Sequence, residues 1–167
     1  MHILHIINNC NRGGAGHVIL ELIDELRQKN VSFTVAYLDG PKNLEIEYKK
    51  MAVKTILLGK NPFLAICRVL RIIKENNISL IHTHLVHASL LGRMVGLFIK
   101  IPIITTRHYI ERSRKYNIMH ILEDYSSKWS DRVIAISKSV SQYLVKMNYV
   151  KYEKCITIYN PINLRLF

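Results

Sequence analysis

Short apolar runs alternate along the chain with longer segments in which apolar residues recur every three or four positions. Because the runs are apolar throughout, they are typical of strands that are covered on both faces of a parallel sheet. The predicted strands are residues 3–8, 32–38, 53–58, 80–83, 102–106, 132–136 and 155–159, and the predicted helices are residues 15–29, 44–50, 61–75, 86–99, 116–129 and a segment that begins at residue 137. We therefore predict one α/β domain with a Rossmann-like, doubly wound, mainly parallel sheet of about seven strands.

The pair Asn61-Pro62 marks a helix start, because asparagine caps a helix and proline tolerates its first turn. Doubly wound sheets bind ligands in the crevice beyond the carboxyl ends of their strands. We therefore expect functional residues directly after the first, fourth and fifth predicted strands.

The chain of 167 residues has the length of one ordinary α/β domain or of half a two-domain enzyme. Apolar types form 49% of it and charged types 22%, so a folded core is expected and disorder is not. The three cysteines include no Cys-x-x-Cys pair, which argues against a disulfide framework and against a cysteine zinc site. A reducing, cytoplasmic location is the expectation.

The net charge of +12 is unevenly distributed, since residues 1–59 hold 7 basic and 6 acidic side chains and residues 60–167 hold 17 and 6. A basic surface attracts the phosphate groups of nucleic acid, of an anionic membrane or of a phosphorylated ligand. The single tryptophan and the scattered tyrosines form no obvious stacking array for bases. Nucleic acid is therefore not expected as a partner.

The longest apolar stretch, residues 85–106, is interrupted by His87, Arg93 and Lys100. A basic side chain at the centre of a bilayer costs about 2.5–3.5 kcal/mol, so we expect no membrane-spanning helix. The first seven residues also lack the basic start and the cleavage site of a signal peptide. Peripheral contact with an anionic membrane, at its inner face, stays open.

A glycine-rich segment, Arg12-Gly13-Gly14-Ala15-Gly16, follows the first predicted strand and leads into a helix. Glycines let a ligand approach the backbone, and the N–H groups at a helix start attract phosphate or carboxylate groups. A mobile turn without a ligand is the alternative. Asp39, near the end of the second strand, is the acidic residue that a dinucleotide-binding fingerprint would need. The fingerprint nevertheless fits poorly, because Ile19 stands where its third glycine belongs.

Histidines follow the fourth predicted strand at His82, His84 and His87. In a strand His82 and His84 project from one face, and His87 lies in the next turn. Three histidines suggest zinc, but no carboxylate lies within residues 78–99 to complete or orient a metal site. We therefore favour the interpretation that one histidine packs in the core while another lines the cleft, and we expect no metal.

Arg107 and His108 come directly after the fifth predicted strand. A histidine in this place can orient a hydroxyl group, take a proton or stabilise developing charge. Arg107 and the basic run of residues 112–115 could hold an anionic part of a substrate, or the run could be a solvated face. The chain has no Gly-x-Ser-x-Gly elbow and no Walker loop, which leaves hydrolase and phosphoryl-transfer functions without support.

Several short stretches, in their order and spacing, resemble the N-terminal domain of retaining family 4 glycosyltransferases, which have the two-domain GT-B architecture. The stretches are His5-Ile6-Ile7 with Arg12-Gly13-Gly14-Ala15, then Leu80-Ile81-His82-Thr83-His84, Pro102-Ile103-Ile104-Thr105-Thr106-Arg107-His108, Ser130-Asp131-Arg132-Val133-Ile134-Ala135-Ile136-Ser137 and Ile156-Thr157-Ile158-Tyr159-Asn160-Pro161-Ile162-Asn163. They extend over the whole chain and indicate the domain, not a substrate.

The resemblance implies that residues 1–167 form the acceptor-binding domain of such an enzyme and that a second domain binds a nucleotide-sugar donor. By likeness, Gly13 and Gly14 line the cleft near the donor phosphates and the transferred sugar. His84 lines the acceptor side, and His108 is the catalytic candidate close to the transferred sugar, an electrostatic and positioning residue rather than a proven base. The implied reaction is transfer with retention, and no cofactor is expected because the nucleotide sugar is a substrate.

The donor-binding domain and its Glu-x7-Glu motif have no counterpart in the sequence, so one half of the cleft is expected here. A lone half should be nearly inactive, because proximity and orientation supply much of the acceleration. We expect a transferase half in surface-polysaccharide or glycolipid assembly, with a sugar or glycolipid acceptor and a donor domain, on this chain or another, as partners. The alternative is a non-catalytic basic binding module or a truncated transferase remnant.

Overall fold

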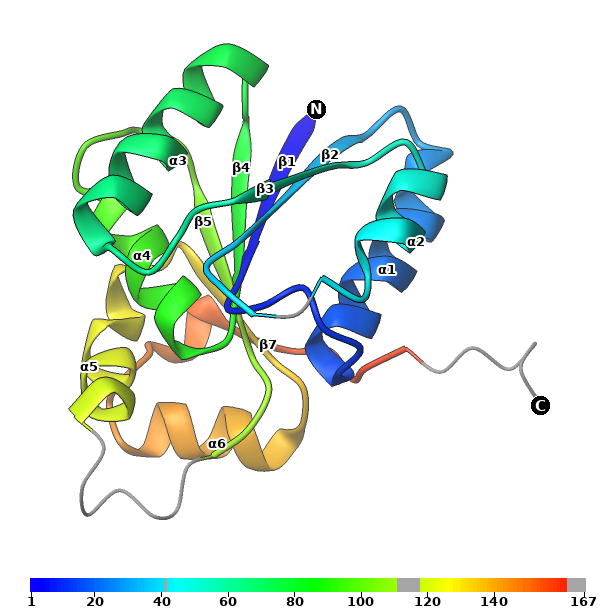
Figure 1. Cartoon of the computed structure of the whole chain (residues 1–167). Coiled ribbons are helices and arrows are strands. Elements are labelled where there is room, and N and C mark those ends of the chain that lie inside the picture. The colour runs from blue at the N-terminus through cyan, green and yellow to red at the C-terminus, as the bar shows by residue number, and fades with distance from the viewer. Residues whose placement is uncertain (41, 111–117, 162–167) are drawn as a thin grey trace.

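The chain folds around one parallel sheet in the computed structural model, which describes residues 1–40, 42–110 and 118–161 (Figure 1). The strands are β1 (His2–Ile7), β2 (Ser32–Tyr37), β3 (Lys54–Leu57), β4 (Leu80–His84), β5 (Ile103–Arg107), β6 (Arg132–Ala135) and β7 (Cys155–Thr157). Their order in the sheet is β3-β2-β1-β4-β5-β6-β7, and every neighbouring pair is parallel. The predicted seven-stranded, Rossmann-like sheet is confirmed.

Helices connect the strands and cover the sheet on both faces. They are α1 (Gly14–Arg27), α2 (Glu45–Lys50), α3 (Pro62–Asn76), α4 (Val86–Gly96), α5 (Ile118–Ser126) and α6 (Lys138–Lys146), with short 3₁₀ turns η2 (Ser127–Trp129) and η3 (Tyr152–Lys154). Helices α1 and α2 lie on one face, and α3 and α4 lie on the other (Figure 1). Each predicted helix is present with ends that differ by a few residues, where helices fray, and positions 116–117 of the predicted helix 116–129 lie outside the described residues.

Alternation along β1 divides its side chains between the two faces. Leu4 and Ile6 are buried in the cluster that contains the apolar side chains of α3 and α4, whereas Ile3 and Ile7 belong to the cluster with α1 and α2. Because successive residues of a strand point to opposite faces, His5 shares the α1 face with Ile3 and Ile7. Burying one such aliphatic side chain stabilises the fold by about 1.5–3 kcal/mol.

The start of α3 forms as predicted. The Asn61 side-chain oxygen accepts hydrogen bonds from the backbone N–H groups of Phe63 and Leu64 at 3.0 and 3.2 Å, and Pro62 occupies the first turn. These contacts satisfy two N–H groups that a helix start otherwise leaves unpaired. The helix ends at Asn76, and Asn77 caps it with a left-handed φ of 51°, a conformation typical of helix C-termini.

The topological switch point of the sheet lies between β1 and β4. From β1 the chain proceeds to β2 and β3 on one side, then crosses to β4 and continues outward to β7 on the other. The loops that leave the carboxyl ends of β1 and β4 therefore separate and open a crevice between them. None of the helices that the structure describes has both the length and the apolarity needed to cross a bilayer.

Candidate functional site

The glycine-rich segment leads into α1 with its first turn uncapped by any side chain. Gly13 is the N-terminal cap with extended backbone, no side chain caps the helix, and no acidic residue stands in its first turn. A Cβ atom added at Gly13 or Gly14 would meet nothing within 4 Å, so open space lies in front of the helix start. A free helix start with open space before it suits an anionic or hydroxyl-bearing ligand.

Gly16 has a different role from its two neighbours. A Cβ atom there would lie 2.6 Å from the backbone oxygen of Asn11 and 2.6 Å from a methyl carbon of Leu44. This separation is far below van der Waals contact, so the third glycine is needed for packing of α1 against the β1–α1 loop. The other element of the dinucleotide-like pattern, Asp39, pairs with Lys60 at 2.7 Å.

The two histidines that resemblance singled out lie side by side at the carboxyl edge of the sheet. His84 is the last residue of β4 and His108 directly follows β5, and these strands are neighbours in the sheet. Nδ1 of His84 lies 3.3 Å from Nε2 of His108. His84 is fully buried, whereas His108 is only half-buried. The pair therefore extends from the core to the surface beside the crevice.

A third histidine, His5, lies beside this pair, and the sequence analysis did not identify it as a site residue. His5 of β1 places Nδ1 3.2 Å from Nε2 of His84, and its ring lies 5.1 Å from that of His82. His5 and His82 are register partners in the neighbouring strands β1 and β4. Side chains of register partners in neighbouring strands project from the same face of the sheet, so His5 and His82 lie together. The sequence alone does not reveal that β1 and β4 are neighbours.

The predicted trio of His82, His84 and His87 is only partly brought together. His82 and His84 share a face as predicted, with ring centroids 4.2 Å apart, but His87 lies on α4 and its Nδ1 contacts the amide nitrogen of Asn8 at 3.2 Å. The ligand atoms that come within 4.8 Å of one another belong to His5, His82 and His84. That group contains no carboxylate, and His82 uses Nε2 in a 2.7 Å hydrogen bond to Thr106.

Burial keeps these imidazoles uncharged at neutral pH. It lowers the pKa of His5 to about 3 and that of His108 to about 4. The pKa values of His82 and His84 also lie well below the usual value, first because of burial and then because of the neighbouring histidines. Each ring therefore carries one proton near pH 7, and the cluster has no net charge.

Arg107 points into the protein rather than into the crevice. Its guanidinium lies 2.8 Å from a carboxylate oxygen of Asp124 and 3.2 Å from one of Glu123, and all three side chains are buried. Burial raises the pKa of Glu123, and Arg107 opposes that rise. This placement favours a structural role, and the predicted contact of Arg107 with a substrate anion stays a prediction. The basic run at 112–115 lies outside the described residues.

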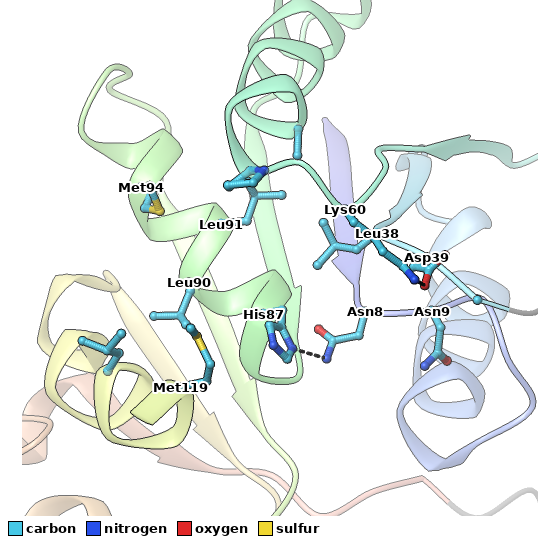
Figure 2. Close-up of a pocket in the computed structure, with 14 residues that line it drawn as sticks. Asn8, Asn9, Leu38, Asp39, Lys60, His87, Leu90, Leu91, Met94 and Met119 are labelled. Atoms are coloured by element: carbon cyan, nitrogen blue, oxygen red, sulfur yellow. Dashed lines mark hydrogen bonds and ion pairs between the residues drawn. The ribbon is translucent and has the colours of Figure 1, made fainter. Parts of the chain in front are cut away.

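A groove of about 770 Å³ opens at the same edge of the sheet, between α3, α4 and α5 and the loops after β1 and β2 (Figure 2). Most of its lining is apolar and comes mainly from helical side chains: Pro62, Ala65, Leu90, Leu91, Met94, Met119 and Leu122. The few polar groups are His87 of α4 and, on the loops after β1, β2 and β3, Asn8, Asn9, Asp39 and Lys60, with Leu38 beside Lys60 (Figure 2). A mainly apolar pocket with a few convergent polar groups is typical of ligand sites.

Asn8 connects this groove to the sheet. Its side-chain oxygen accepts a hydrogen bond from the backbone N–H of Ala88 at 2.9 Å, and its amide nitrogen holds His87. The residue thus satisfies a donor at the start of α4 while it orients a polar side chain of the groove. Sequence reasoning missed the groove, because α5 comes from the β5–β6 connection and packs against α4 only in the folded chain.

Residues 12–166 match the family model described as Glycosyltransferase Family 4. The chain belongs to glycosyltransferase family 4. The resemblance drawn from the short sequence stretches is thereby confirmed, and the sheet order agrees with the Rossmann-like domain it implies.

Two curated relatives of this family 4 chain are O-antigen glycosyltransferases of Escherichia coli. The O-antigen biosynthesis glycosyltransferase WbnH and the probable O-antigen biosynthesis glycosyltransferase WbiN are each 29% identical to it over 161 residues. The match covers 94% of this chain and 48% of each relative. The family 4 chain thus spans about half the length of the curated relatives it matches.

Solved structures share the fold of this family 4 domain at low sequence identity. Anabaena HepE in complex with UDP-glucose superposes with a TM-score of 0.85 at 16% identity, over all of this chain and 46% of HepE. A glycosyltransferase from Rickettsia africae gives 0.76 at 20% identity, over 97% of this chain and 43% of that one. A UDP-GlcNAc 2-epimerase from Methanocaldococcus jannaschii gives 0.73 at 11% identity over 96% of this chain, so the fold alone does not fix the reaction.

Proposed function

We propose that this chain is the acceptor-binding half of a retaining glycosyltransferase that acts in surface-polysaccharide or glycolipid assembly. A second domain, on the same or another chain, would bind the nucleotide-sugar donor. Family membership and the O-antigen relatives support the reaction class and the process. The match to about half of each relative, and of HepE with its bound UDP-glucose, supports a division of labour between two domains.

The observation that carries the acceptor assignment is this mainly apolar groove with its few polar groups. A glycolipid acceptor has a sugar that needs hydrogen-bonding partners and a chain that needs an apolar surface. The helical side chains of Leu90, Met119 and Leu122 offer the apolar surface, and the loops offer Asn9 and the Lys60–Asp39 ion pair to the sugar. The groove thus suits a sugar acceptor that carries an alkyl or isoprenoid chain.

Gly13, Gly14 and His108, which do not line the groove, would form the surface that faces the donor. The uncapped start of α1 and the open space before it would accommodate the donor phosphates or the transferred sugar. The half-buried, uncharged ring of His108 would stabilise or position groups of the transferred sugar without delivering a positive charge. The buried ring of His84 would act on the acceptor side only through its neighbours.

Exposed apolar side chains at the ends of α4 and of the α5–η2 segment support peripheral contact with a membrane that contains the acceptor. Leu97 and Phe98 at the end of α4 are 72% and 68% exposed, and Ile118 and Trp129 at the two ends of the α5–η2 segment are 64% and 60% exposed. Lys100 and Lys128 accompany them in the sequence, and the chain carries a net charge of +12. Apolar side chains flanked by lysines suit the anionic, cytoplasmic face of a membrane.

The proposed reaction can be tested by restoring the missing half. This chain is joined to the donor-binding half of WbnH, and transfer from a panel of nucleotide sugars to alkyl glycosides is measured. We expect transfer from one nucleotide sugar with retained anomeric configuration, and a loss of about 10²–10³-fold in kcat for His108→Ala. Ile46→Asn, which changes an exposed residue on α2, is the matched control.

Two outcomes would contradict this proposal. Unchanged kcat in His108→Ala would remove the assignment of that ring. Binding of RNA by the chain alone, with a steep salt dependence and no preference for any sugar, would instead support the alternative, a basic binding module.

A further inference from the structure

We propose that His5 and His84 are positioning residues that fix the proton of the His108 ring on Nδ1, so that His108 offers an N–H donor to the ligand. The identity of that ligand rests on the proposed function, but the position of the proton is a property of the folded domain. Neither His5 nor His84 touches the ligand in this account. Both act through His108.

The three rings form one continuous line of hydrogen bonds. Nδ1 of His5 lies 3.2 Å from Nε2 of His84, and Nδ1 of His84 lies 3.3 Å from Nε2 of His108. A hydrogen bond between two ring nitrogens needs one proton between them, donated by one ring to the lone pair of the other. The low pKa values of His5 and His108, about 3 and about 4, leave one proton on each ring.

With one proton per ring, only two arrangements satisfy both contacts. In the outward arrangement His5 donates from Nδ1 to His84, His84 donates from Nδ1 to His108, and the proton of His108 is on its own Nδ1. In the inward arrangement His108 donates from Nε2 to His84, His84 donates from Nε2 to His5, and the proton of His5 is on Nε2. The nitrogen that carries the proton of His5 therefore decides which nitrogen carries the proton of His108.

The surroundings of His5 favour the outward arrangement. The ring is 1% exposed, lies against Phe33 with centroids 5.9 Å apart, and its Nε2 is buried with no hydrogen-bond partner. The inward arrangement would place an N–H group there without an acceptor, and an orphaned buried N–H is rarer in proteins than an acceptor left short of donors. The unsatisfied buried donor of the inward arrangement therefore biases the cluster toward the outward one.

The outward arrangement decides what His108 can do. Its Nε2 lone pair is occupied by the proton of His84, so it is not available to accept a proton from a substrate hydroxyl. Its Nδ1–H can donate to a sugar hydroxyl or to an oxygen on which negative charge develops. No proton is transferred in this role, since the ring keeps its single proton throughout.

The same cluster does not favour a metal. A metal ion would need Nε2 of His84, which contacts His5, or Nδ1 of His84, which contacts His108. The group within reach consists of three neutral histidines without a carboxylate, so a divalent cation would be buried with no opposite charge. Hydrogen bonding between the rings accounts for their close approach without such a charge.

The test is ring-nitrogen NMR on the ¹⁵N-histidine-labelled chain, which shows directly which nitrogen of each imidazole carries the proton. Single variants at each position assign the signals. We expect His5, His84 and His108 to be protonated on Nδ1 at pH 7 with no ligand present. A proton on Nε2 of His108, a second proton on its ring, or zinc bound stoichiometrically to the purified chain would overturn the proposal.

Substitution of His5 then separates the relay from a merely structural effect. His5→Asp places only acceptor oxygens near Nε2 of His84, so that nitrogen should carry a proton, whereas His5→Asn can still donate near the place of Nδ1 and should keep the proton of His84 on Nδ1. An unchanged His84 ring in a folded His5→Asp variant would refute the role of His5. If that variant fails to fold, the wild-type spectrum still decides. The spectra need no substrate, so they can succeed even if sugar transfer fails.

Discussion

Replacing Arg107 by methionine tests whether this buried guanidinium stabilises the fold or binds a substrate. The side chain is 3% exposed and pairs with Glu123 at 3.2 Å and with Asp124 at 2.8 Å, and the hydroxyl of Tyr143 donates to the same aspartate at 3.1 Å. Arg107→Met keeps most of the aliphatic volume but removes the buried guanidinium that pairs with Glu123 and Asp124. Breaking a buried pair in this way costs about 3–5 kcal/mol.

The loss is large enough to measure by thermal or urea unfolding. For a domain of this size 1 kcal/mol shifts Tm by about 2–4 °C, so Arg107→Met should lower Tm by about 6–20 °C. The matched control is Arg27→Met, which removes an exposed arginine paired with Asp24 at 2.8 Å. Exposed pairs contribute about 0–1 kcal/mol, so the control should shift Tm by no more than a few degrees.

The pH dependence of the Arg107→Met defect follows from Glu123. Burial raises the pKa of Glu123 in the folded state, and removing Arg107 raises it further. An acid with a raised pKa stabilises the folded state most below its ordinary pKa and loses that contribution as pH rises through the folded value. The defect should therefore be larger at pH 8 than at pH 5. A fully stable variant that has lost ligand binding would refute the structural role and support the substrate contact.

Three further predictions concern the glycine segment, a helix cap and a buried histidine. Gly16→Ala should destabilise the fold by about 1–3 kcal/mol in urea titrations, because its Cβ would lie 2.6 Å from the backbone oxygen of Asn11. Gly14→Ala should leave the free energy of unfolding unchanged, and equal losses in the two variants would contradict the packing argument. Asn61→Ala should cost about 0.5–2 kcal/mol by the same measurement, and no change would mean that the two cap bonds contribute nothing. The pKa of His5 falls from 6.5 to about 3 on folding, so the wild-type free energy of unfolding should decrease as pH is lowered through that window. His5→Phe should flatten this decrease. If the free energies of unfolding of wild type and variant fell in parallel with pH, His5 would not be a buried neutral ring.

The strands and helices were predictable because continuous apolar runs and three-to-four-residue periodicity are local features. The places of His84 and His108 were predictable as well, since the carboxyl ends of parallel strands share one edge of the sheet. His5 could not be found in the same way, because its contact with His84 depends on β1 and β4 being neighbours.

The burial of Arg107 and the existence of the groove could not be predicted from local sequence patterns. An arginine at a strand end suggests a cleft, but its partners Glu123 and Asp124 come from α5, and their burial is decided by how α5 packs. Likewise, no local pattern shows that Met119 and Leu122 face the side chains of α3 and α4 across a groove. Both features arise from packing between segments far apart in the sequence.

The central claim, that this domain binds the acceptor rather than the donor, is tested most directly by calorimetric titration of the chain alone. Methyl, hexyl and octyl glycosides, kept below micelle formation, are compared with UDP-glucose, and Leu122→Asp in the groove is compared with Ile46→Asn on α2. We expect the affinity for glycosides to rise with alkyl length and to fall about tenfold or more in Leu122→Asp but not in Ile46→Asn. UDP-glucose should bind far more weakly than the octyl glycoside. Tight UDP-glucose binding, with glycoside binding unaffected by Leu122→Asp, would contradict the claim.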